Sequence, residues 1–171
     1  MRNFIWSDLH IFHANIIKYC NRPFATVEEM DKKIIENWKA TVKNDDVLWN
    51  LGDVACHMNK EQLTTLIHSL PGYKILILGN HDHHNINRWR DIGFDEVYPY
   101  PIIYKSWFIL SHDIVFLNEK LPYVNIHGHT HNRSMQEKSY VNVSVEVINY
   151  CPVDLDEIIK SKITLDTENE K

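Results

Sequence analysis

One arrangement constrains this chain more than any other: a short apolar run followed at once by residues that can bind a metal or move a proton. Its clearest instance is residues 74–82, Lys-Ile-Leu-Ile-Leu-Gly-Asn-His-Asp. The apolar run predicts a buried strand, and Gly79 allows a sharp turn after it. Catalytic groups in open α/β sheets lie just beyond the carboxyl ends of strands. We therefore expect Asn80, His81 and Asp82 at such an end.

Four further stretches repeat this arrangement, and the repetition strengthens the prediction. They read Trp6-Ser7-Asp8-Leu9-His10, Leu51-Gly52-Asp53, Leu110-Ser111-His112 and His127-Gly128-His129-Thr130-His131. Asp8 and His10 are two positions apart, so on an extended segment both would point to the same side. Carboxylate, imidazole and amide groups without thiolate suit Mn, Fe, Zn, Co or Ni. They are too many for one ion, whereas two ions about 3.5–4 Å apart, sharing a carboxylate, would suit phosphoester hydrolysis.

The first half of the chain alternates between strands and helices. Apolar runs predict strands at 4–6, 47–51 and 75–78, and helices are expected from Thr26, from Asn59 and over 86–92. Thr26 and Glu29 have the spacing of a capping box. This alternation predicts a largely parallel, right-handed arrangement.

The second half has a different pattern. Short aromatic and branched runs at 97–98, 102–104 and 107–110 predict antiparallel hairpins. The alternation over 141–147 predicts a strand with four valines on one buried face, and 155–159 predicts a closing helix. Together the two halves predict an α/β (α+β) fold, a four-layer αββα sandwich of two facing mixed β-sheets flanked by helices. We expect one domain over residues 1–171, with the charged stretch 161–171 frayed.

The composition narrows the range of binding partners expected for this chain. The net charge of -5 and the pI near 6.1 argue against a broad basic surface, so no long nucleic acid is expected as a partner. Bound cations can still attract a small phosphorylated substrate. No apolar stretch approaches the roughly 20 residues of a membrane span, so no membrane partner is expected. Three separated cysteines suggest no disulfide framework. We expect a cytoplasmic protein, and the sequence leaves its oligomeric state open.

Taken in order, the five strand-end motifs resemble those of the calcineurin-like metallophosphoesterases. The matching motifs are Asp-x-His, Gly-Asp, Gly-Asn-His-Asp, Ser-His and Gly-His-x-His, spread from Asp8 to His131. The small single-domain bacterial, archaeal and phage-type members are the most similar. The resemblance implies a dinuclear metal-dependent phosphohydrolase, in which a metal-bridging hydroxide attacks phosphorus in line. Its substrate would be a small phosphoester, a nucleotide among the candidates, with a phosphodiester slightly preferred over a phosphomonoester.

The resemblance also implies a role for each matching residue. Asp8, His10 and His131 would bind the first ion, Asp53 would bridge, and Asn80, His112 and His129 would bind the second. His81 would face the phosphate, as a general acid or as a stabiliser of charge in the transition state. Manganese is the expected metal, with Fe, Zn, Ni or Co as alternatives.

Two departures from the family pattern bear on the substrate. Val54-Ala55-Cys56-His57 follows Gly-Asp, where protein phosphatases of the family carry a second aspartate and an arginine. A phosphoserine/threonine protein phosphatase is therefore not expected. Asp113-Ile114 replaces the aromatic residue and proline that often follow Ser-His in relatives, which leaves the role of Asp113 open.

Several alternatives remain open from the sequence. His13 and His57 lie near predicted ligands and would either support a ligand or contact substrate. Asp82 would either orient His81 or cap the helix that begins at Ile86. The alternative functions are a nuclease acting on short nucleic acid, which the acidic balance disfavours, and a non-catalytic metal-binding scaffold. A scaffold is expected to lose ligands, and every predicted ligand position here is filled.

Overall fold

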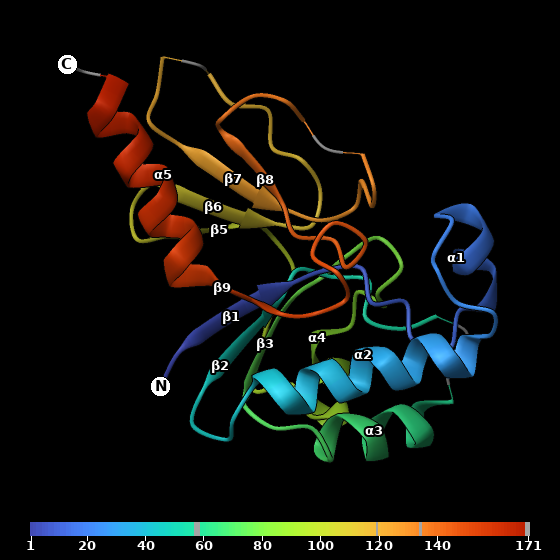
Figure 1. The fold of residues 1–171 in the computed structure, drawn as a ribbon. Helices are drawn as coiled ribbons and strands as arrows, with labels where there is room; N and C mark the ends of the chain where they lie inside the picture. The colour runs from blue at the N-terminus through green and yellow to red at the C-terminus, as the bar shows by residue number, and fades with distance from the viewer. Residues whose placement is uncertain (57–58, 119, 134, 170–171) are drawn as a thin grey trace.

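The computed structural model describes residues 1–56, 59–118, 120–133 and 135–169. Two β-sheets face each other and helices flank them (Figure 1). The strands are β1 (Asn3–Trp6), β2 (Val47–Asn50), β3 (Tyr73–Ile77), β4 (Glu96–Tyr98), β5 (Ile102–Tyr104), β6 (Phe108–Ser111), β7 (Val124–His127), β8 (Tyr140–Asn142) and β9 (Val153–Asp154). The helices are α1 (Ala14–Tyr19), α2 (Val27–Thr41), α3 (Lys60–His68), α4 (Ile86–Ile92) and α5 (Leu155–Asn169).

The first sheet has the order β4-β3-β2-β1-β9. Strands β1 to β4 are parallel, which confirms the arrangement predicted for the first half of the chain. The expectation that 97–98 belongs to a hairpin was wrong, because β4 instead adds to the edge of β3. The two-residue strand β9 pairs antiparallel with β1 and was not predicted, since Val153-Asp154 is too short to show a pattern.

The second sheet has the order β5-β6-β7-β8. Only one of its pairs, β5 with β6, is the antiparallel hairpin expected here, while β6–β7 and β7–β8 are parallel. The connections 112–123 and 128–139 explain the difference. Each is about a dozen residues long, enough for the chain to return to the start of the sheet and pair in parallel.

The strand predicted over 141–147 was wrong beyond Asn142. After β8 the chain leaves the second sheet, and Val145 donates its amide hydrogen to the Ser7 carbonyl at 3.1 Å. It then turns, with Val147 donating to the Ser144 carbonyl at 3.0 Å. Val145 is fully buried whereas Val147 is 38% exposed, so the valines do not share one face.

Helices α2, α3 and α4 cover one face of the first sheet (Figure 1). As the capping box predicted, Thr26 accepts a hydrogen bond from the Glu29 amide at 3.2 Å, although the Glu29 carboxylate caps Ala25 rather than Thr26. The buried side of α2 includes Trp38, whose ring packs edge-on against Trp6 with centroids 5.2 Å apart. Its indole nitrogen donates to the Pro71 carbonyl at 3.0 Å, so the buried polar group is satisfied.

A second apolar core fills the space between the sheets and includes Ile5, Ile77 and Ile126. Helix α5 contributes Leu155 and Ile159 to this core and runs beside the second sheet in Figure 1. It begins after Asp154, whose carboxylate accepts from the backbone amides of the first turn, and it extends to Asn169. The backbone of 161–169 is helical, and the fraying expected over 161–171 stays a prediction.

These observations confirm the predicted fold class, an α/β fold with two facing mixed sheets flanked by helices. Among the described residues, no helix combines the length and the apolar character that crossing a lipid bilayer requires.

We expect Trp38→Ala to lower the free energy of unfolding by about 3–5 kcal/mol, because it leaves a large cavity under α2. Urea denaturation followed by circular dichroism measures this change. The control is Phe116→Ala, which removes an aromatic ring that is 86% exposed. Its expected effect is within about 0.5 kcal/mol. Equal losses in the two variants would contradict the packing described for α2.

Candidate metal centre

The polar strand ends of both sheets meet at one edge of the molecule. The segment after β1 pairs with the loop after β2, since the Asp8 amide donates to the Gly52 carbonyl at 3.1 Å and the His10 amide to the Asp53 carbonyl at 2.9 Å. The two sheets are joined where the His129 amide donates to the Asp8 carboxylate at 2.9 Å. The structure thus brings the strand-end motifs together, as the sequence predicted.

The backbone at this edge adopts a conformation that the sequence reasoning missed. The ligand-type residues with left-handed backbone are Asp8 (φ 60°), His10 (φ 51°), Asp53 (φ 55°), His129 (φ 65°) and His131 (φ 51°). Such conformations cost roughly 1–3 kcal/mol each outside glycine and cluster at functional sites. The expectation of an extended segment at Asp8 and His10 was wrong, because β1 ends at Trp6 and the chain then coils.

Asp8, His10 and His131 form what we term the first group, whose potential metal-binding atoms all lie within 4.8 Å of one another. His10 Nε2 is buried and, within the described residues, has no hydrogen-bond partner. Burial, together with the nearby Arg22 cation, lowers the pKa of His10 to about 2. The imidazole is therefore neutral, as a metal ligand must be. On its other side, His10 Nδ1 lies 3.3 Å from His13 Nδ1.

Asn80, His112 and His129 form the second group. His112 Nε2 and His129 Nδ1 lie 2.8 Å and 2.9 Å from Asn80 Oδ1, and 3.2 Å from each other. The three atoms thus converge on one small space. Asp113, whose role the sequence left open, brings Oδ1 to 3.3 Å from His129 Nδ1 and so borders this group.

Asp53 lies between the two groups. Its Oδ2 is 3.4 Å from His10 Nε2 and 3.5 Å from His112 Nε2. Burial and the neighbouring Asp8 carboxylate raise the pKa of Asp53. Two buried carboxylates so close together are unfavourable unless a cation compensates them. The donor set and the unpartnered His10 nitrogen therefore fit divalent metal ions.

Asp82 plays neither of the two roles considered for it. Its carboxylate accepts hydrogen bonds from the backbone amides of Asp53 at 2.8 Å, Gly79 at 2.8 Å and Val54 at 3.1 Å. Helix α4 is capped instead by Asn85, which accepts from the Arg88 amide. Asp82 therefore ties the turn after β3 to the loop that carries Asp53.

Gly79 is required by how closely these two loops approach. A Cβ atom at this position would collide with Asp53 Oδ1 and with the Asp53 amide nitrogen. The small residue at the end of β3 therefore provides room for the central carboxylate, in addition to the turn that the sequence predicted.

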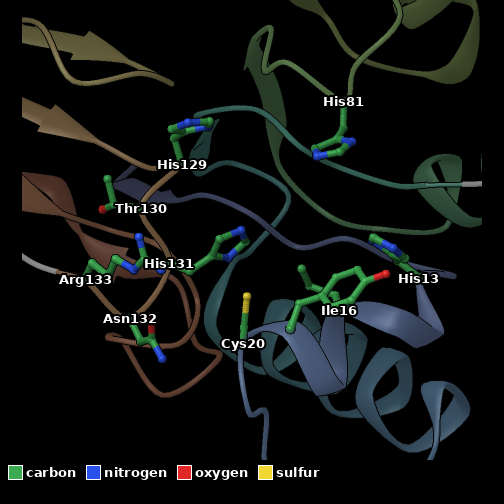
Figure 2. A pocket seen from close by; sticks show the side chains of 10 residues that line it. His13, Ile16, Cys20, His81, His129, Thr130, His131, Asn132 and Arg133 are labelled. Carbon is green, nitrogen blue, oxygen red and sulfur yellow. The ribbon is translucent and has the colours of Figure 1, made fainter.

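His81 lies at the open side of the site. Its amide donates to Asp53 Oδ1 at 2.8 Å, and its ring centroid is 5.2 Å from that of His10. The ring lines a pocket of about 550 Å³ whose wall also includes His13, Ile16 and His131 (Figure 2). In that view His81 and His131 approach the pocket from different sides. His57, which was expected near the site, lies outside the described residues.

Three buried charged residues near the site were not predicted. Asp31, in helix α2, is buried and accepts the Phe12 amide hydrogen at 3.1 Å. Arg22 and Glu146 form an ion pair with an N–O distance of 2.7 Å, and Glu146 also contacts His131. The residue pattern did not reveal these buried charges. In the valine-rich run that contains Glu146, the alternation instead indicated that the charged side chain faces solvent.

The chain is similar to several known proteins. A family model described as Calcineurin-like phosphoesterase matches residues 1–163. An uncharacterised protein of Methanocaldococcus jannaschii, MJ1445, is 39% identical over 165 residues, covering 92% of this chain and 89% of that protein. The Gene 66 protein of Mycobacterium phage L5 is 34% identical over 128 residues, covering 72% of this chain and 57% of the phage protein.

A solved structure is similar as well. The crystal structure of AQ665 from Aquifex aeolicus, a protein of unknown function, superposes with a TM-score of 0.72 and 28% sequence identity. The match covers 93% of this chain and 98% of the Aquifex chain, so the similarity extends over both sheets.

We expect Asp82→Asn to lower the free energy of unfolding by about 2 kcal/mol, because the amide group would turn a donor toward backbone N–H groups. Metal affinity should fall as well, since the Asp53 loop loses its anchor. Burial raises the pKa of Asp82 to about 6, so both proteins are compared at pH 8, where the carboxyl group is ionised. The control, Asp91→Asn, removes a charge from a side chain that is 63% exposed. It should change the free energy of unfolding and the metal affinity little. Unchanged stability and metal affinity in Asp82→Asn would contradict the anchoring role.

Proposed function

The chain belongs to the calcineurin-like phosphoesterase family, which hydrolyses phosphoesters with divalent metal ions, and we propose that it is a dinuclear phosphodiesterase acting on a small substrate. The main support for a dinuclear site is the position of Asp53. One carboxylate oxygen lies within 3.5 Å of a nitrogen from each group, His10 Nε2 and His112 Nε2. This is the place that a carboxylate shared by two ions would occupy.

In this proposal the first group would hold one ion, the second group would hold the other, and Asp53 would be shared between them. The set combines carboxylate oxygens, neutral imidazoles and one amide oxygen. Manganese accepts such a mixture readily, and Fe, Zn, Ni or Co are the alternatives. When bound, the pair of ions would supply a hydroxide nucleophile from water at neutral pH.

The residues of the chain contribute positioning and proton transfer. The His81 amide donates a hydrogen bond to Asp53 Oδ1. This bond fixes the His81 backbone at the edge of the site. The ring is exposed toward the pocket, where it can donate a proton to the departing alkoxide oxygen. His13 Nδ1 lies 3.3 Å from His10 Nδ1 and orients the His10 ring through this nitrogen, which leaves His10 Nε2 for a metal ion.

The pocket beside the site supports a diester substrate. Its volume of about 550 Å³ is within the range of small-molecule sites and is sufficient for the second ester substituent. Ile16 and Tyr19 provide an apolar surface, and Asn132 and Arg133 provide polar groups for the same space. A nucleoside combines a flat base with a polar sugar, so its apolar and polar surfaces match those of the pocket.

We expect metal-stripped protein to be inactive and to regain activity with Mn²⁺, with two ions bound per chain. The assay compares bis(4-nitrophenyl) phosphate with 4-nitrophenyl phosphate, a cyclic nucleotide and a short oligonucleotide, each with several divalent metals. The diester should be hydrolysed faster than the monoester.

Asp53→Asn should lower metal content and abolish hydrolysis while leaving the circular dichroism spectrum nearly unchanged. Activity that survives exhaustive chelation would refute the proposal.

We expect His81→Ala to keep both metal ions and to lose about 10²–10⁴-fold in kcat, the usual contribution of a general acid. The loss should be larger for an alkyl ester than for a 4-nitrophenyl ester, whose leaving group needs little protonation. His68→Ala, which removes an exposed imidazole from α3, is the matched control. An equal loss with both leaving groups would assign His81 to charge stabilisation rather than proton donation.

A further inference from the structure

We propose that the buried Arg22–Glu146 ion pair is a positioning element that sets the metal affinity of the first group. It does so by fixing both the Asp8–His10 loop and the His131 ring. This inference rests on the proposed metal centre but does not depend on the substrate.

Arg22 supports the loop between Asp8 and His10. Its guanidinium group is fully buried, with Nη2 donating to the Asp8 carbonyl at 2.7 Å and Nη1 to the Leu9 carbonyl at 2.9 Å. These two peptide groups belong to the segment in which Asp8 and His10 adopt left-handed backbone. A planar donor that binds two successive carbonyls holds the strained loop in one conformation.

Glu146 transfers this support to His131. Its side chain is 5% exposed, and Oε1 accepts from Arg22 Nε at 2.8 Å and lies 2.9 Å from His131 Nδ1. An ionised carboxylate only accepts hydrogen bonds, so Nδ1 of His131 carries the hydrogen. This leaves Nε2 as the nitrogen that a metal ion would bind.

The pair connects segments far apart in sequence that share the first group. In the described part of the chain, its hydrogen bonds reach the Asp8–Leu9 backbone, His131 and Met30, and none reaches the second group. Buried ion pairs contribute little net stability on average, because desolvation opposes the attraction. Glu146 Oε2 is moreover buried without a hydrogen-bond partner in that part of the chain. A positioning role explains such a pair better than a stabilising one.

The test is calorimetric titration of Mn²⁺ into metal-stripped wild-type protein and variants. We expect Glu146→Ala to weaken one of the two binding steps about 10–100-fold and to leave the other within about twofold. Arg22→Lys should weaken the same step, since an ammonium group cannot bind both carbonyls and Glu146 together. The control is Glu157→Ala, which breaks an exposed ion pair of similar length and should change neither step.

A second measurement needs no metal. In the metal-free protein, the hydrogen on His131 Nδ1 should exchange slowly with solvent in NMR spectra, because Glu146 accepts its hydrogen bond, and Glu146→Ala should speed this exchange. If Glu146→Ala does not fold, Glu146→Gln is judged by the same two measurements.

Two results would overturn the inference: both binding steps unchanged in a folded Glu146 variant, or both weakened equally. A wild type that binds two ions but hydrolyses no phosphoester would refute the proposed function while leaving this inference intact. A wild type that binds no Mn²⁺ would refute both.

Discussion

The burial of negative charge where the two sheets meet is the constraint on which the rest of this structure depends. Asp8 and Asp53 are almost completely inaccessible to solvent, and their carboxylates influence each other. Such a pair persists only when surrounding groups hold it in place and positive charge can reach it. The backbone amides of His81 and His129 each donate to one of these carboxylates, so the polypeptide itself provides part of the compensation.

The parallel strands of the second sheet explain how so many side chains reach one place. In a parallel sheet the carboxyl ends of neighbouring strands lie at the same edge, and here β1–β3 and β6–β7 both direct that edge toward the site. Antiparallel hairpins would have placed His112 and His129 at opposite ends of the second sheet. The long connections between β6, β7 and β8 are therefore a requirement of the site as much as a feature of the fold.

The sequence predicted the convergence because that prediction needed only strand ends and residue types. It could not predict the left-handed backbone of Asp8 and His10, since Asp and His adopt this conformation more often than most residues but still only rarely. The role of Asp82 was also hidden, because its partners are backbone amides that carry no side-chain signature. Arg22 and Glu146 were missed because each finds its partner 124 positions away in the chain. Local rules thus predicted which ligand-type residues come together, whereas the supporting contacts required the tertiary structure.

The long span between these partners has a consequence for biosynthesis. The Asp8 loop and Arg22 leave the ribosome early, but Glu146 is made when most of the chain has already been synthesised. During this interval the site lacks His112, His129 and His131. The first and second groups can be assembled only after these residues have been made, so the site can form only late in the synthesis of the chain.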